Sequence, residues 1–283
     1  MKKINGKEIA AKKLLKLKED IEELNLEPSL GVILVGDDAP SHLYVKLKEK
    51  AAKEIGIELR KYIFDAEASE DELRLSIEFL NNDLDTHGII VQLPLAKQFN
   101  ADDIVSLVNP KKDVDGFHSA NQERFLHNEE FIYPVFPRAI VELIDSCNVI
   151  LSGKKAVVIG KSDVFDRVMT HALERKGLKT QFIQCVDRVI FSQKEKEIIN
   201  QSDVIVTACG VPRVLSCDIV QDGAIVIDGG ISKVDGKTVG DVDVKNCIDR
   251  DIFISPVPGG VGPMTIAFLM ENVVQLAKRN IKK

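Results

Sequence analysis

Short apolar runs alternate along the first half of the chain with stretches whose apolar residues recur every three or four positions. Residues 31–35 and 88–95 are nearly continuous apolar runs and predict buried strands, and residues 60–65 predict a third strand. Residues 6–25 and 70–82 have the spacing of amphipathic helices. Apolar strands that alternate with helices are typical of a parallel sheet covered on both faces.

The second half repeats this alternation. Helices are predicted at residues 139–147, 166–176 and 264–278. Strands are predicted at residues 153–160, 180–185, 203–208, 224–228 and 252–256. This order is Rossmann-like. A chain of 283 residues is long for one core, so we expect two α/β domains.

Composition narrows the function class. Hydrophobic residues make up 45% of the chain and the net charge is −6, so no basic surface for nucleic acid is indicated. The five cysteines form no CxxC pair, which predicts neither a zinc site nor a disulfide framework and fits a reducing cytoplasm. The histidines form no ligand set, so no metal is expected. No signal peptide and no membrane span is recognisable.

Candidate chemistry follows the carboxyl ends of two predicted strands. Ser41 can cap a helix on which Tyr44 and Lys48 are four residues apart and share a face. Gln92 is a polar amide near the end of the apolar run 88–95. Ligands of parallel sheets bind beyond the carboxyl ends of the strands, so these side chains can converge. The alternative is that Lys48 is solvated and Gln92 pairs with local backbone.

Four motifs occur in order and together carry a resemblance. They are YVxxK at residues 44–48, VQLPL at 91–95, KDVDGFH at 112–118 and PVPGGVGPMT at 256–265. Without the resemblance, residues 113–118 would be interpreted as a solvated turn. With these motifs the chain resembles the bifunctional methylenetetrahydrofolate dehydrogenase/methenyltetrahydrofolate cyclohydrolase family over nearly its whole length.

The resemblance implies roles on the folate side. Lys48 is the implied acid/base, Tyr44 positions the folate, Gln92 holds and tunes Lys48, and Asp115 accepts hydrogen bonds from the pterin. Lysine can move protons only if it is neutral part of the time, so its pKa must be lowered, and partial burial acts in that direction. The remaining implied substrate-binding residues are Val91, Leu93, Pro258, Gly259, Gly260, Val261 and Gly262.

The resemblance also implies a nucleotide site, although GxGxxG is absent. The implied cofactor-binding residues are Gly160, Lys161, Ser162, Asp187 and Ile231. The cofactor is NADP, with NAD possible, because Lys161 suits a 2′-phosphate whereas an acidic residue such as Asp187 favours ribose hydroxyls. The chain departs from the family pattern near this site at Val135, Phe136, Phe165, Asp166 and Val168.

The implied architecture is a folate-binding catalytic domain of residues 1–120 with 263–283, and a Rossmann-like nucleotide domain of residues 121–262, with a cleft between them. The implied function is oxidation of 5,10-methylenetetrahydrofolate, then hydrolysis to 10-formyltetrahydrofolate. The alternatives are a cyclohydrolase whose nucleotide domain no longer supports oxidation and a non-catalytic folate or nucleotide sensor. The expected partners are one-carbon tetrahydrofolate derivatives and a second copy in a cytoplasmic homodimer, without nucleic acid or membrane.

Overall fold

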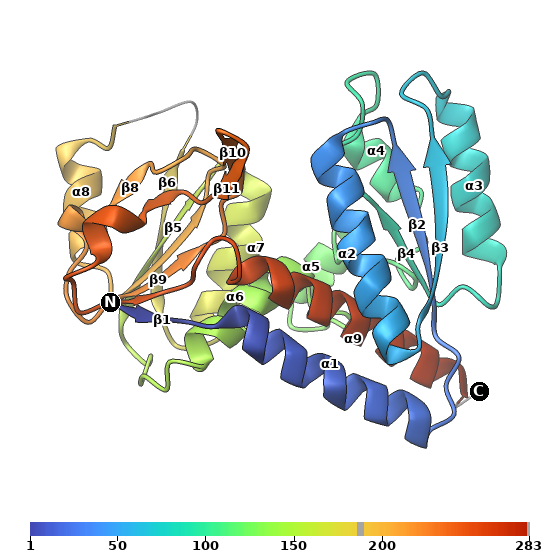
Figure 1. The fold of residues 1–283 in the computed structure, drawn as a ribbon, viewed down its shortest axis with the longest axis horizontal. Helices are drawn as coiled ribbons and strands as arrows, with labels where there is room; N and C mark the ends of the chain where they lie inside the picture. The colour runs from blue at the N-terminus through green and yellow to red at the C-terminus, as the bar shows by residue number, and fades with distance from the viewer. Residues whose placement is uncertain (186–189, 282–283) are drawn as a thin grey trace. The chain divides into compact units, whose positions relative to one another are not determined.

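The chain divides into two compact units (Figure 1). A computed structural model describes residues 1–185 and 190–281. The three-strand unit comprises Ala10–Val135 and Ile266–Lys283, and the six-strand unit comprises Met1–Ile9 and Phe136–Thr265. Helices α1 (Gly6–Glu23) and α9 (Val261–Ile281) have residues in both units.

The three-strand unit is built on a parallel sheet of strand order β3-β2-β4, as its apolar runs predicted. The strands are β2 (Ser29–Val35), β3 (Glu58–Phe64) and β4 (Gly88–Val91). The helices are α2 (Ala39–Ile55), α3 (Glu70–Asn82), α4 (Ala101–Ser106) and α5 (Ser119–Leu126). Every residue of the central strand β2 is buried, which explains why its sequence is a continuous apolar run.

Two local predictions in this unit were wrong. Asp38, not Ser41, caps helix α2, because its carboxylate accepts hydrogen bonds from the Ser41 backbone N–H at 2.9 Å and the Ser41 hydroxyl at 2.7 Å. Strand β4 ends at Val91 and does not run to residue 95. Pro94 has no N–H to donate to a sheet ladder, so Gln92 lies just beyond the strand.

The six-strand unit contains an all-parallel sheet of order β1-β13-β9-β7-β5-β6, which confirms the Rossmann-like prediction. The strands are β1 (Lys2–Lys3), β5 (Lys155–Gly160), β6 (Lys179–Gln184), β7 (Val204–Ala208), β9 (Ile225–Asp228) and β13 (Phe253–Ile254). The helices are α6 (Val135–Asp145), α7 (Asp163–Glu174) and α8 (Gln193–Asn200). Chain order reverses between β5 and β7, and such switch points are where open α/β sheets bind ligands.

Short elements complete the six-strand unit. They are the pair β10 (Ser232–Val234) and β11 (Lys237–Val239), the pair β8 (Leu215–Ser216) and β12 (Val242–Asp243), and the 3-10 helices η1 (Cys217–Ile219) and η2 (Val244–Cys247).

The N-terminal segment belongs to the six-strand unit. Strand β1 was not predicted from its lysine pair; it adds to the sheet edge because Lys2 pairs with Phe253 and its N–H donates to Ile252 O at 2.7 Å. The compact units therefore divide the chain differently from the expected domains at residues 1–9, 121–135 and 263–265. Short polar edge strands have no apolar pattern that a sequence reading could detect.

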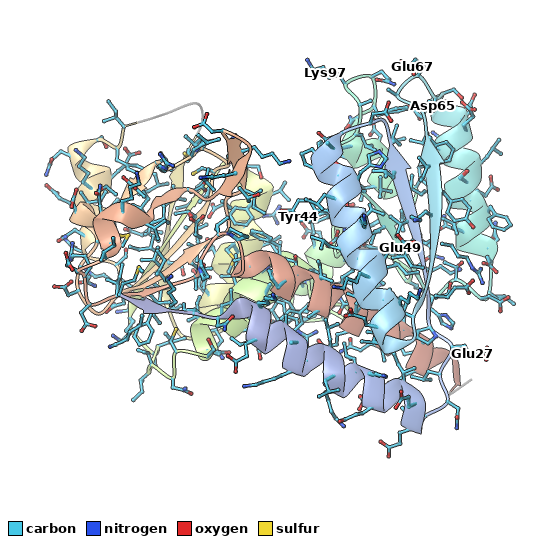
Figure 2. All side chains as sticks on the ribbon, viewed as in Figure 1. Glu27, Tyr44, Glu49, Asp65, Glu67 and Lys97 are labelled. Carbon is cyan, nitrogen blue, oxygen red and sulfur yellow. A yellow bond between two sulfur atoms is a disulfide. The ribbon has the colours of Figure 1, made fainter. Side chains whose placement is uncertain are left out.

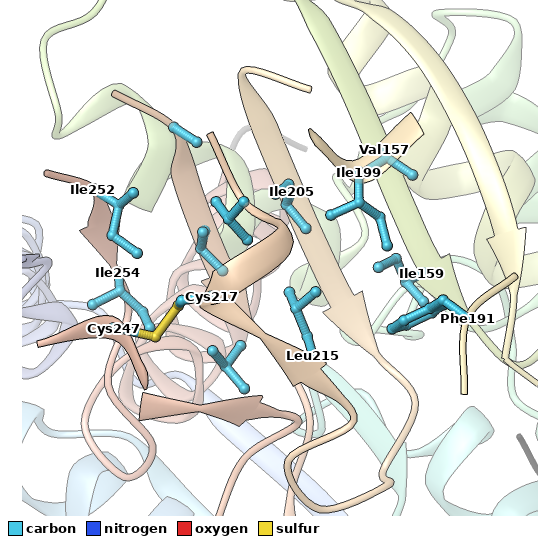
Figure 3. Packing of buried hydrophobic residues seen from close by; sticks show 14 of the residues in the cluster. Val157, Ile159, Phe191, Ile199, Ile205, Leu215, Cys217, Cys247, Ile252 and Ile254 are labelled. Carbon is cyan, nitrogen blue, oxygen red and sulfur yellow. A yellow bond between two sulfur atoms is a disulfide. The ribbon is translucent and has the colours of Figure 1, made fainter. Parts of the chain in front are cut away.

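The core of the six-strand unit contains a disulfide. Ile159, Ile205 and Ile254 belong to this buried apolar cluster (Figure 3). Cys217 and Cys247, buried in the same cluster, are joined by a disulfide between η1 and η2. The prediction that the cysteines form no disulfide was therefore wrong, because a separation of 30 residues gives no sign that two sulfur atoms meet. No helix within the described residues has the length and apolarity to cross a membrane.

Candidate active site

Helix α2 carries Tyr44 and Lys48 on one face. The helix follows the carboxyl end of β2, and both side chains are half-buried whereas Val45 and Ala52 are buried in the unit's interior (Figure 2 labels Tyr44). Their partial burial places them between core and solvent, where a side chain can meet a ligand. The spacing of four residues therefore places Tyr44 and Lys48 on the same face of the helix, as the sequence predicted.

Gln92 is fixed between the backbone and Lys48. Its Nε2 donates to Leu93 O at 2.7 Å, and its Oε1 accepts a hydrogen bond from Lys48 Nζ at 2.9 Å. The donor end of the amide is thus occupied locally, which aims the acceptor end at the amine. Both alternatives considered for Gln92 hold together: it pairs with local backbone and with a functional group from a neighbouring element.

Asp115 lies on a loop built around a different carboxylate, that of Asp113. Asp113 is only 4% exposed and accepts hydrogen bonds from Gly116 N–H at 3.0 Å, His118 N–H at 3.0 Å and Asn121 Nδ2 at 2.9 Å. The segment is therefore a loop ordered from within and not a solvated turn.

Two further contacts hold this loop to the unit. Val135 N–H donates to Asp115 O at 3.1 Å, and the buried Asn272 of α9 donates from Nδ2 to Val114 O at 2.8 Å. Sequence reasoning singled out Asp115 and missed Asp113, Asn121 and Asn272. Their signal was weak: Asp113 is a second acidic residue two positions from the first, Asn121 lies in a polar helix, and Asn272 lies in an apolar one.

Charges at the site are coupled. Burial lowers the pKa of Lys48, and the negative charge of Asp115 opposes this shift. Burial raises the pKa of Asp115 to about 6; the charge of Lys48 counteracts this rise and the charge of Asp113 adds to it. Burial also raises the pKa of the Tyr44 hydroxyl. The expected lowering of the lysine pKa is present, and its cause is desolvation.

The other residues predicted to bind substrate lie in both units. Val91 ends β4 and is buried, and Leu93 is half-buried beside Gln92. The loop 258–262 belongs to the six-strand unit, where Gly259 O accepts a hydrogen bond from Lys7 N–H at 2.9 Å. A role in folate binding for Pro258, Gly259, Gly260, Val261 and Gly262 stays a prediction.

The predicted cofactor residues lie at the carboxyl edge of the six-strand sheet. Gly160 ends β5, the Lys161 side chain is exposed, and Ser162 caps α7 by accepting a hydrogen bond from Phe165 N–H at 3.2 Å. Ile231, which follows β9, is 44% exposed. Asp187 lies outside the described residues.

Two buried carboxylates that sequence reasoning missed shape this edge. Asp241 accepts hydrogen bonds from Cys209 N–H at 2.6 Å and Val211 N–H at 2.9 Å, which fixes the turn after β7. Asp228 accepts from Gly230 N–H at 3.1 Å and from Asp241 N–H at 3.0 Å, which fixes the segment that carries Asp241. Burial raises the pKa of both, that of Asp228 to about 6. The sequence signal for Asp228 was its position at the end of an apolar strand.

The geometry of this edge fits a dinucleotide. A Cβ built on Gly210 would have only Ile231 O within reach, at 4.0 Å, so the turn after β7 leaves its backbone open to a ligand. The N-terminus of α7 follows the first strand of the series, where pyrophosphate binds in doubly wound sheets. Lys161 supplies an exposed cation at this edge, and Ile231 supplies an exposed apolar side chain. These residues would hold the cofactor.

Comparison with known proteins agrees with this geometry. Models of the tetrahydrofolate dehydrogenase/cyclohydrolase catalytic domain and NAD(P)-binding domain match residues 4–115 and 134–281. The bifunctional protein FolD of Bacillus subtilis (strain 168) is 39% identical over 282 residues, covering 98% of each chain. The bifunctional protein FolD of Methanosarcina mazei is 34% identical and covers 98% of this chain and 96% of the relative.

Solved structures show the same fold. The FolD methylenetetrahydrofolate dehydrogenase/cyclohydrolase of Campylobacter jejuni superposes with a TM-score of 0.91 at 38% identity, with 99% of each chain covered. The Trypanosoma brucei enzyme, solved with NADP and an inhibitor, gives a TM-score of 0.92 at 29% identity over 99% of this chain and 98% of that one.

The fold and site define a two-domain α/β protein with a lysine-centred polar site and a dinucleotide-binding type of sheet. The chain belongs to the tetrahydrofolate dehydrogenase/cyclohydrolase family. The resemblance and the fold class predicted from the sequence are confirmed.

Proposed function

We propose that this chain oxidises 5,10-methylenetetrahydrofolate to 5,10-methenyltetrahydrofolate and hydrolyses that product to 10-formyltetrahydrofolate. The observation that carries the proposal is the half-buried Lys48 amine, hydrogen-bonded to Gln92 at 2.9 Å and electrostatically coupled to Asp115. A protein that only binds folate would not need an amine with a lowered pKa, so the site favours an enzyme over a sensor.

In the hydrolysis, water adds to the cationic methenyl carbon, and neutral Lys48 takes the proton that the bound water loses. The lysine then takes part in moving a proton from the carbinol oxygen to the ring nitrogen N5 as the carbon–N5 bond breaks. The net reaction consumes one water and releases one proton. Gln92 holds the amine in place throughout, because its own donor end is tied to Leu93 O.

Substrate orientation is assigned to Asp115 and Tyr44. An ionised Asp115 carboxylate accepts hydrogen bonds from the amide-like donors of the pterin, and Tyr44 packs against the folate. The loop at residues 258–262 is assigned to folate binding by the family resemblance. This arrangement acts by positioning, which is a large part of what a hydride-transfer site requires.

The cofactor is NADP, which accepts the hydride when it is bound. Lys161 is assigned to the 2′-phosphate that distinguishes NADP from NAD because its side chain is an exposed cation. Gly160 and Ser162 lie at the first turn after β5. Asp187 is assigned to the ribose end of the same site. Ile231 would pack against the nicotinamide.

The proposal includes a cytoplasmic homodimer. It rests on the family resemblance and on a mixed, mildly acidic charge of −6. Sedimentation of the purified chain at several concentrations tests the dimer.

Replacement of Lys48 by Met tests the catalytic role. We expect Lys48→Met to lower cyclohydrolase activity by about 10²- to 10⁴-fold, because the general acid/base is lost. Binding of the folate, measured by calorimetry, stays detectable because Asp115 and Tyr44 remain. The control is Lys46→Met, an exposed lysine on the same helix. Undiminished hydrolysis in Lys48→Met would show that the role is misassigned.

A further inference from the structure

Two phenylalanine rings lie against glycine backbone at the cofactor edge. The rings of Phe136 in α6 and Phe165 in α7 meet edge to face, with centroids 5.7 Å apart. A Cβ built on Gly160 would lie 2.6 Å from Phe165 Cδ1, and one built on Gly229 would lie 2.8 Å from Phe136 Cζ. Each ring therefore occupies the space directly above a glycine at the carboxyl end of a strand.

The register of the sheet places this aromatic pair beside the topological switch point. Gly160 of β5 is opposite Ala208 of β7, and Thr207 of β7 is opposite Asp228 of β9. Strand β7 therefore lies between the two glycines that the rings cover. Strands β5 and β9 are about 10 Å apart, a distance that two contacting rings bridge. In doubly wound sheets the first strand ends in a tight turn and the pyrophosphate binds at the N-terminus of the helix that follows. Here the ring of Phe165, in the first turn of that helix, covers the glycine that ends the strand.

Acidic side chains occupy the first turn of α7. Asp163 and Asp166 both lie there, and the Thr170 hydroxyl donates to Asp166 Oδ1 at 2.8 Å. Carboxylates favour their own helix at this position but repel a second anion. The Ser162 hydroxyl accepts a hydrogen bond from Phe165 N–H, which caps the helix and holds Phe165 at this turn.

We propose that Phe136, Phe165 and Asp166 determine cofactor affinity, by keeping the pyrophosphate of a nicotinamide dinucleotide away from Gly160 and by repelling its charge. The inference rests on the proposed function, because it concerns the dinucleotide of the oxidation step. Both effects act on the pyrophosphate that NAD and NADP share. They therefore weaken binding of the two cofactors equally and leave discrimination between them to Lys161.

The test is direct binding of NADP and NAD to the full chain by calorimetry. Phe165→Val removes the ring and keeps an apolar side chain, and Asp166→Asn removes the charge and keeps an oxygen for the Thr170 hydroxyl. We expect each change to lower the Kd of NADP about tenfold. The control is Val164→Ala, a side chain of the same turn that is 52% exposed.

The two cofactors give the decisive comparison. The ratio of the NAD and NADP Kd values stays unchanged in Phe165→Val and Asp166→Asn if the pair acts on the pyrophosphate. An unchanged or increased Kd in both variants overturns the inference. A Kd that falls for only one of the two cofactors also overturns it. The nearly isosteric Asp166→Asn variant keeps the test decisive if Phe165→Val does not fold.

Cyclohydrolase activity separates this inference from the proposed function. Neither variant changes a residue of the Lys48 site, so hydrolysis should proceed as in the unmodified chain. If the unmodified chain has no cyclohydrolase activity, the proposed function is refuted. The comparison of Kd values would still decide the role of the rings.

Discussion

Single side chains at the Lys48 site control each other's protonation. Lys48 and Asp115 interact electrostatically, and each counteracts the shift that burial imposes on the other. Burial makes the neutral amine easier to reach than it is in an exposed lysine, and the charge of Asp115 limits this effect. A lysine of this kind is common at sites that move protons, and uncommon on the solvated face of a helix.

The pKa of Asp115 predicts how substrate use depends on pH. Its folded value of about 6 lies above the ordinary value, so the carboxylate that accepts the pterin hydrogen bonds is lost as the pH falls through 6. We expect kcat/KM for methenyltetrahydrofolate hydrolysis to fall about tenfold per pH unit below that point. Steady-state kinetics from pH 4.5 to 8 measure it.

The matched variant is Asp115→Asn, which cannot ionise. It should have a lower kcat/KM throughout and no acid limb near pH 6. A similar acid limb in Asp115→Asn would assign the titration to another group.

At the scale of elements, the loop at residues 113–118 shows how a site is held in place. A buried carboxylate, that of Asp113, accepts three hydrogen bonds and thereby fixes the backbone that presents Asp115. A parallel bridge between Ile89 of β4 and Asp113 joins the start of the loop to the sheet, and the Asp113 carboxylate holds the residues that follow. Side-chain acceptors satisfy backbone donors where regular structure does not.

Asp113→Asn tests this arrangement. The amide keeps one acceptor oxygen but places an NH₂ group against the donors of His118 or Asn121, so we expect the free energy of unfolding to fall by about 1–3 kcal/mol. The KM for folate should rise because Asp115 is less well positioned. Urea unfolding and steady-state kinetics measure the two effects.

Asp65→Asn, at an exposed position of the same unit, is the control. Equal stability and equal KM in the Asp113 and Asp65 variants would show that the loop does not depend on its buried carboxylate.

At the scale of the whole molecule, the residues assigned to the two reactions come largely from different compact units. Tyr44, Lys48, Gln92 and Asp115 all belong to the three-strand unit, whereas the residues assigned to NADP belong to the six-strand unit or lie outside the described residues. The chain can therefore lose one activity and keep the other.

Asp241→Asn should separate the two activities. Asp241 fixes the turn after β7 by accepting from Cys209 and Val211, and an amide cannot accept both bonds as well as a carboxylate. We expect dehydrogenase activity to fall about tenfold or more while cyclohydrolase activity is retained. Paired assays of the same preparation, with a thermal unfolding curve, measure the outcome.

The control is Asp235→Asn, an exposed residue with φ of 50°, where asparagine is tolerated. A parallel loss of both activities in Asp241→Asn, without a change in thermal unfolding, would contradict the separation.

The sequence by itself determined most of the framework. Buried strands such as β2 and β7 are continuous apolar runs, and α3 begins and ends at the predicted residues, because burial and helical period are properties of neighbouring residues. The ordered motifs also led to Lys48, Gln92 and Asp115. The loop of Asp113 and the edge strand β1 have no such local pattern.

Tertiary structure alone decided which polar atoms and sulfur atoms meet. Lys48 and Gln92 are 44 residues apart, and Cys217 and Cys247 are 30 apart. The carboxylates of Asp228 and Asp241 hold backbone from other segments, and the rings of Phe136 and Phe165 cover glycines on separate strands. Such contacts depend on which strands are neighbours and in what register, and no stretch of sequence contains that information, since it arises only when distant segments pack together.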